Sequence, residues 1–154
     1  MSTQRNEGDG CLHKFLSAHA CGILEIFNDI EHEDTDANYY AIRESMKLEY
    51  EILSQHVELM RAFGENEKYL VQAMQNMTDD ANSITYEALL LLSFFVMRPV
   101  KNDQVRSVLH KNAKQMIQFI QTFKVRGRPA EEMEEFRDFK DQMLMALRQH
   151  QAGL

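Results

Sequence analysis

Apolar residues recur every three or four positions along most of this chain of 154 residues, which is the spacing of the buried face of an α-helix. Only six glycines and two prolines interrupt the pattern. The sequence therefore predicts an all-α fold. The expected helices lie at about 11–31, 37–56, 65–78, 82–97, 102–125 and 130–149.

Two of these segments indicate which residues should form the core. Segment 82–97 is apolar nearly all round, so we expect it to be a buried central helix. The last segment instead carries a single apolar stripe, formed by Met133, Phe136, Phe139, Met143, Leu144 and Leu147. A helix of this second kind packs on a neighbour and leaves its other side to water.

The chain also repeats itself. The segments "ILEIFNDI" (Ile23–Ile30), "LVQAMQNM" (Leu70–Met77) and "MIQFIQTF" (Met116–Phe123) share one pattern of apolar and polar positions and begin 47 and 46 residues apart. The tripeptide "DAN" occurs at 36–38 and again at 80–82, 44 residues later. Repeats of this length, built from two or three helices, are typical of armadillo- and HEAT-like stacks, in which neighbouring units share one core. We therefore expect about three repeats, arranged in a right-handed superhelix.

The first ten residues are polar, and we expect residues 1–10 to form a disordered tail and residues 11–150 a single repeat domain. They lack the apolar region of a signal peptide, and the longest uncharged run, Ala88–Met97, is too short to span a bilayer. The two cysteines, Cys11 and Cys21, form neither a metal-ligand pattern nor a disulfide framework. These features predict a cytoplasmic protein that does not enter a membrane.

Composition narrows the function further. Hydrophobic residues make up 44% of the chain and charged residues 27%, which is the balance of a folded protein. The net charge of −7 argues against nucleic-acid binding, which needs a basic surface. The one basic segment, "KVRGRP" (Lys124–Pro129), suits the end of a helix that stops at Gly127.

The sequence contains no complete motif for catalysis or for binding a metal or cofactor. The segment "DTDAN" (Asp34–Asn38) begins like a calcium-binding loop, but Tyr39 and Ser45 occupy the positions that need glycine and glutamate. The histidines do not pair at a metal-binding spacing, and no phosphate-binding loop or catalytic triad pattern occurs. We therefore expect no enzyme activity, no metal and no cofactor.

The remaining candidates are partner-binding residues on helix surfaces. Arg43 and Lys47 lie one turn apart, where two like charges repel unless an anion answers them. Lys47 could instead pair with Glu51, which would make this ordinary solvated surface. A second candidate surface is the flank formed by Lys111, Gln115, Gln118 and Thr122. Met74 occupies the same repeat position as Phe27 and Ile120, so it belongs either to the core or to a binding pocket.

Several stretches resemble the calcium-binding protein 39 family, the Mo twenty-five scaffolds. They are "FLSAH" near Phe15, "NYYAIRESMKLEYEIL" (38–53), "ITYEALLLLSFFVMRPVKNDQ" (84–104) and "LHKNAKQMIQFIQTF" (109–123). The resemblance covers about residues 12–149 and corresponds to the C-terminal part of that family, whose members are about twice as long as this chain. It implies an armadillo-like scaffold that binds and activates protein kinases or pseudokinases of the sterile-20 type.

The resemblance also assigns roles to particular residues. Met74 and Lys111 would line a C-terminal pocket for a Trp-Glu-Phe-like tail, with Lys111 facing the carboxylate of the tail. Gln115 stands where the family has a second lysine, although Lys114 is adjacent. Arg43 and Lys47 would be cations of the concave surface that meets the kinase. Glu49 stands where the family has a leucine, on the face that also carries Ile42, Met46 and Leu53.

An alternative remains open alongside this interpretation. The chain could be a helical-repeat interaction or structural module that does not activate a kinase and associates with itself through its first repeat, because truncated stacks need capping. A monomer or a weak homodimer is compatible with both interpretations.

Overall fold

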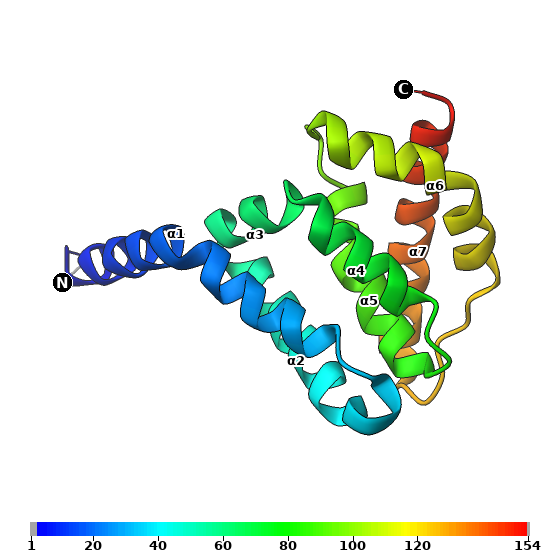
Figure 1. The fold of residues 1–154 in the computed structure, drawn as a ribbon, viewed down its shortest axis with the longest axis horizontal. Coiled ribbons are helices and arrows are strands. Elements are labelled where there is room, and N and C mark those ends of the chain that lie inside the picture. Colours follow the sequence, from blue (N-terminus) through cyan, green and yellow to red (C-terminus); the bar gives the residue numbers. More distant parts are fainter. Residues whose placement is uncertain (1–2, 154) are drawn as a thin grey trace.

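The structure is a computed structural model that describes residues 3–153. Within them the chain forms seven α-helices and no strand (Figure 1), which confirms the all-α prediction. The helices are α1 (Thr3–Glu31), α2 (Thr35–Gln55), α3 (Val57–Gly64), α4 (Glu67–Met77), α5 (Asn82–Val96), α6 (Asp103–Thr122) and α7 (Ala130–Gln151). Helix α2 is kinked at Asn38, where φ is −125° and ψ is 25°.

The predicted start of the first helix is wrong. Helix α1 begins at Thr3, so the segment expected as a tail at 1–10 is helical from its third residue, and residues 1–2 lie outside the described part. The polarity of this segment suggested disorder. A helix that is already anchored farther along can nevertheless extend at little cost, because each added residue gains one backbone hydrogen bond. No proline interrupts the segment.

Helix α3 is absent from the sequence-based prediction, which treated residues 57–64 as a connection. The chain breaks at His56, whose backbone is extended (φ −128°, ψ 102°), and then forms two more helical turns. These turns bury Leu59 and Phe63, one helical turn apart. Eight residues are too few for a helical period to stand out from a loop.

The helices lie in two rows. Helices α1, α4 and α6 follow one another in one row, and α2, α5 and α7 follow one another in the second (Figure 1). Each helix of the first row packs on one of the second, as α1 with α2, α4 with α5, and α6 with α7, while α3 contacts the first two pairs. The three repeated segments of the sequence fall in α1, α4 and α6, so they occupy corresponding places in one row.

Hydrogen bonds connect successive helix pairs. The side-chain amide of Gln72 donates to the carbonyl of Glu31 at 3.2 Å, over 41 residues. The amide of Asn82 donates to the carbonyl of Lys124 at 2.9 Å, and its oxygen accepts from the backbone N–H of Arg126 at 3.0 Å, over 42 and 44 residues. These separations of 41 to 44 residues are close to the sequence repeat of 44 to 47 residues, as expected for contacts between neighbouring units.

Helix α5 forms the centre of the core, as predicted. Its residues Ile84, Ala88, Leu89, Leu91, Leu92 and Phe95 are almost completely buried. The helix contacts α2, α3, α4 and α7, which explains why it is apolar nearly all round. The predicted stripe of the last helix is correct for Phe136, Met143, Leu144 and Leu147 but wrong for Met133, which is 40% exposed in the first turns of α7.

Two carboxyl groups are buried between α1 and α2. Glu49 is only 1% exposed on the apolar face of α2, and Glu31 at the end of α1 is also buried. The hydroxyl of Ser45 donates to Glu31 at 3.5 Å. Burial raises the pKa of both carboxyls far above the usual range, and the neighbouring charge of Glu31 raises the pKa of Glu49 further. Both carboxyls therefore favour the protonated form more strongly than an exposed glutamate does.

Candidate functional site

The first pair of predicted site residues lies on α2, in the second row of helices. Lys47 is exposed, whereas Arg43 is half-buried and its Nε is shielded from solvent without a hydrogen-bond partner. Among the described residues neither side chain forms an ion pair, so the pairing of Lys47 with Glu51 that the sequence allowed is not formed. A shielded guanidinium N–H without an acceptor is costly, and an acceptor on a bound partner would remove that cost.

A buried ion pair lies next to these residues. Glu87 on α5 is buried, and its carboxylate accepts a hydrogen bond from Arg128 Nη2 at 3.1 Å. Arg128 also reaches Glu132 at 3.5 Å and stacks over the Tyr86 ring at 3.8 Å from its centre. Arg128 immediately follows Gly127, whose φ of 70° is a conformation that glycine adopts without strain.

Electrostatics connects Arg43 and Lys47 with this ion pair. Burial raises the pKa of the Glu87 carboxyl, while Arg128, Lys47 and Arg43 counteract the rise. The charges of these two α2 residues therefore influence the protonation of Glu87 on α5. Arg128, just before α7, and Arg43 and Lys47 of α2 thus all act on one buried carboxyl. Arg128 is shared between Glu87 and Glu132, so Arg43 and Lys47 are the two of these cations without a carboxylate partner among the described residues.

Glu87 and Arg128 were not identified from the sequence, which explained Arg128 as part of a basic helix end. A signal was nevertheless present. Glu87 lies 44 residues after Arg43, which is the separation of the two "DAN" tripeptides, so the two residues occupy the same position in successive repeats. Aligning the repeats would have placed an acid and a base at equivalent positions of neighbouring units.

The second set of predicted site residues lies in the first row. Lys111, Lys114 and Gln115 are exposed on α6. Met74 on α4 is partly buried and packs against the core, so it contributes to the core but keeps an accessible part. Helices α4 and α6 contact each other. A ligand that contacted both Met74 and the α6 residues would have to bridge these two helices.

The acidic segment that resembles a calcium loop has a structural role. The carboxylate of Asp34 accepts the backbone N–H of Asp36 at 3.2 Å and caps the start of α2. The side chain of Asn38 donates to the carbonyl of Asp34 at 3.2 Å. Within the described residues, no cluster of three or more His, Cys, Asp or Glu side chains is arranged to hold a metal ion. None of the described helices combines the length and the apolar character needed to cross a bilayer.

Comparison with known proteins identifies the family. Residues 10–150 match the family model described as Mo25-like. The chain belongs to the Mo25-like family. This confirms the resemblance found in the sequence, and the family implies an armadillo-like repeat fold, in agreement with the two rows of helices. Mo25-like proteins are known as non-catalytic scaffolds.

The individual relatives are distant. The chain is 29% identical over 125 residues to the calcium-binding protein 39-like proteins of Mus musculus and Homo sapiens, covering 80% of this chain and 36% of each relative. It is 27% identical over 101 residues to the degreening-related gene dee76 protein of Auxenochlorella protothecoides, covering 64% of this chain and 32% of the relative. The chain thus spans about a third of the length of the curated relatives it matches.

Proposed function

We propose that this protein is a non-enzymatic scaffold that binds a protein kinase or pseudokinase of the sterile-20 type and activates it. Membership of the Mo25-like family supports a scaffold role. The observation that carries the proposal is that Arg43 and Lys47, whose charges act on the buried Glu87, have no carboxylate partner among the described residues. A kinase lobe that presents carboxylates to this face would pair with both cations.

A second contact would hold the C-terminal tail of the partner. In this proposal the accessible part of Met74 packs against an aromatic side chain of a Trp-Glu-Phe-like tail, and Lys111 binds its carboxylate. Lys114 and Gln115 lie beside Lys111 on the same exposed flank of α6. One apolar contact and one charge-assisted hydrogen bond are the usual hot spots of such an interface.

The tail contact is tested by titrating the protein with a fluorescent peptide that ends in Trp-Glu-Phe. Met74→Ala and Lys111→Glu should each weaken binding by about tenfold or more, which is the cost of a lost hot spot. Lys124→Glu makes the same charge change at an exposed lysine just beyond α6 and should leave binding unchanged. The assignment of Met74 and Lys111 to the tail contact would be refuted if the peptide did not bind, or if Lys124→Glu weakened peptide binding as much as Lys111→Glu.

Kinase activation is tested separately, with a purified sterile-20-type kinase and a peptide substrate. Arg43→Glu combined with Lys47→Glu should abolish any stimulation of the kinase, because carboxylates would then face carboxylates. Arg137→Glu, at an exposed arginine of α7, is the control. If the double variant still stimulates fully, the face around Glu87 does not contact the kinase.

A specific observation favours one alternative, an interaction module that associates with itself. Helix α1 projects beyond the other helices (Figure 1) and exposes three large apolar side chains. Leu12 is 48% exposed, Phe15 56% and Ile26 63%. Light scattering distinguishes the alternatives, because self-association through α1 gives a dimer that Phe15→Glu converts to a monomer.

A further inference from the structure

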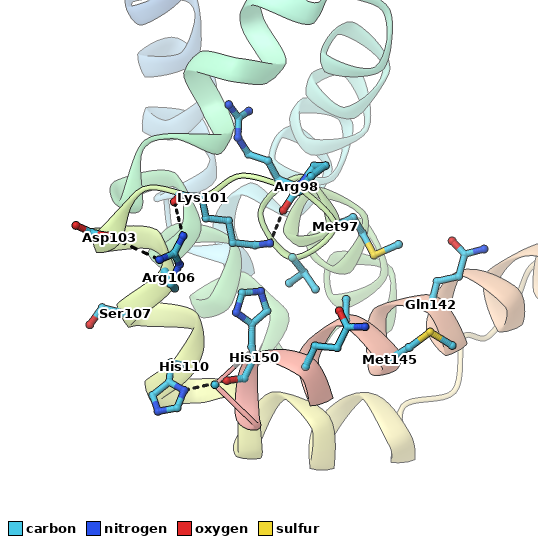
Figure 2. A pocket seen from close by; sticks show the side chains of 15 residues that line it. Met97, Arg98, Lys101, Asp103, Arg106, Ser107, His110, Gln142, Met145 and His150 are labelled. Atoms are coloured by element: carbon cyan, nitrogen blue, oxygen red, sulfur yellow. Dashed lines mark hydrogen bonds and ion pairs between the residues drawn. The ribbon is translucent and has the colours of Figure 1, made fainter.

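A large hollow opens at the end of the stack that is farthest from α1. It has a volume of about 970 Å³ and lies where the connection between α5 and α6 meets α6 and the last turns of α7 (Figure 2). None of the residues assigned to the kinase or its tail lines this hollow. It is therefore a feature that the proposed function does not use.

One wall of the hollow is cationic. Lys101 is half-buried, and its ammonium donates one hydrogen bond, to the carbonyl of Arg98. Arg106 donates to the carbonyl of Lys101 at 3.2 Å, and its nearest carboxylate oxygen is that of Asp103, at 3.9 Å. His150 is buried beside Lys101, and its own carbonyl is bonded to His110 at 2.9 Å (Figure 2).

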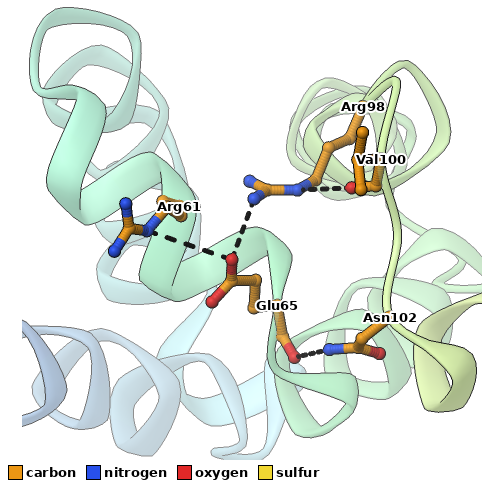
Figure 3. A network of polar contacts seen from close by, with 5 residues as sticks. All are labelled: Arg61, Glu65, Arg98, Val100 and Asn102. Atoms are coloured by element: carbon orange, nitrogen blue, oxygen red, sulfur yellow. Dashed lines mark hydrogen bonds and ion pairs between the residues drawn. The ribbon is translucent and has the colours of Figure 1, made fainter.

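Lys101 differs from Arg98 and Arg128, two half-buried arginines with ion pairs, in having no carboxylate partner among the described residues. The side chain of Arg98, which also lines the hollow, is 21% exposed and pairs with Glu65 at 3.0 Å (Figure 3). Arg128 is 17% exposed and pairs with Glu87. No described carboxylate forms an ion pair with Lys101, which uses one of its three N–H donors on a carbonyl.

The pKa values agree with an excess of positive charge at this wall. Burial lowers the pKa of Lys101, and the charges of Arg106 and Arg98 lower it further. Burial also lowers the pKa of His150, and Lys101, Arg106 and His110 add to the effect. A bound anion would relieve the repulsion among these groups.

The opposite wall is apolar. Met97 and Met145 face the hollow from the end of α5 and from α7 (Figure 2), and both are exposed to solvent. A smaller hollow of about 440 Å³ adjoins the first and shares Met97, Arg98 and Pro99 with it. Apolar side chains around the smaller hollow include Met60, Phe94 and Val100. Together the two hollows place an apolar surface next to a cationic one.

We propose that this hollow binds an acidic peptide segment of a partner protein. An anionic side chain lies between Lys101 and Arg106, and a neighbouring apolar side chain packs against Met97 and Met145. The volume is far larger than a single carboxylate or phosphate needs, and the apolar wall suits a peptide better than a free inorganic ion. The choice of an acidic ligand follows from charge complementarity with Lys101, which has no carboxylate partner among the described residues, and with Arg106, whose pair with Asp103 is long and exposed.

The test measures binding of a fluorescent peptide that alternates glutamate and leucine. A peptide with glutamine in place of every glutamate tests the charge, and one with phosphoserine in place of glutamate tests the nature of the anion. Arg106→Gln and Lys101→Met should each weaken binding roughly tenfold, the effect of one charge-assisted hydrogen bond. Asp103→Asn removes the carboxylate at the rim and should strengthen binding.

Controls separate this site from the proposed kinase contacts. Arg137→Gln removes an exposed cation of α7 outside the hollow and should not change the affinity, and neither should Lys111→Glu. Thermal melting confirms that each variant is folded, and Asp103→Asn gives a readout that a folding defect cannot imitate. The proposal is overturned if neither acidic peptide binds, if the glutamine peptide binds equally well, or if Arg106→Gln has no effect. Tighter binding of the phosphoserine peptide or of the glutamate peptide supports the site and identifies its preferred anion.

Discussion

Replacing the buried Glu49 with leucine should stabilise this protein, and by an amount that depends on pH. Glu49 is 1% exposed, and burial together with the charge of Glu31 raises its pKa from 4.5 to about 10. At pH 7 an unfolded chain releases this proton, whereas the folded protein keeps it. Folding at pH 7 therefore requires Glu49 to bind a proton that it would release in the unfolded chain, and this lowers the free energy of unfolding.

The magnitude follows from the pH and the unfolded pKa. The pKa of Glu49 in the folded protein lies above 7. The free energy that folding loses at pH 7 therefore depends only on the difference between pH 7 and the unfolded pKa of 4.5, and the exact folded pKa does not matter. This difference corresponds to about 3 kcal/mol at about 1.4 kcal/mol per pH unit. Because the carboxyl pKa is raised on folding, the contribution of Glu49 to the free energy of unfolding is greatest below pH 4.5. This contribution is lost as the pH rises toward the folded pKa. Leucine removes this loss and fits a face formed by Ile42, Met46 and Leu53.

The assay is urea unfolding, followed by far-UV circular dichroism at several pH values between about 5 and 8. The free energy gained by Glu49→Leu should be small at the acid end and grow by about 1.4 kcal/mol per pH unit toward neutrality. Glu49→Gln should remove the same pH dependence while gaining less, because its amide remains buried. Glu44→Gln, an exposed glutamate of the same helix, is the control. A gain from Glu49→Leu that stays constant with pH would refute the reasoning.

Three further variants test separate features of the fold by chemical denaturation. Phe95→Ala empties a fully buried site of α5 and should cost about 3–5 kcal/mol of unfolding free energy; a loss below about 1 kcal/mol would contradict the central position of this helix. Arg128→Met leaves the Glu87 carboxylate buried and unpaired and should cost about 3 kcal/mol, of which Glu87→Gln in the same chain should recover a part. Gly127→Ala forces a side chain onto a backbone with φ of 70° and should cost about 1 kcal/mol, whereas Gly22→Ala, inside α1, should stabilise slightly.

The sequence was informative wherever many residues contribute to one pattern. Helix α5 is recognisable because its apolar residues cover every side, and the two-row stack follows from a period that extends over most of the chain. The position of Glu49 among Ile42, Met46 and Leu53 was also correct, since all four residues are buried on one face of α2.

Features that depend on one or two side chains were harder to foresee. The pairing of Arg128 with Glu87 joins residues 41 positions apart, and helical periodicity within a single helix cannot reveal it. The same holds for the cationic hollow, because Lys101, Arg106 and His150 come together only when α6 packs on α7. Helix α3 was missed because its two buried apolar side chains, Leu59 and Phe63, are too few to establish a period.

The hydrogen bonds of Asn82 have a consequence for how the surface of this protein can change by mutation during evolution. Its amide group contacts only the backbone at Lys124 and Arg126, through a carbonyl and an N–H. The side chains of these two residues point to solvent and take no part in the junction. Mutation can therefore alter the chemistry displayed at this edge while the spacing and orientation of the two units are inherited unchanged.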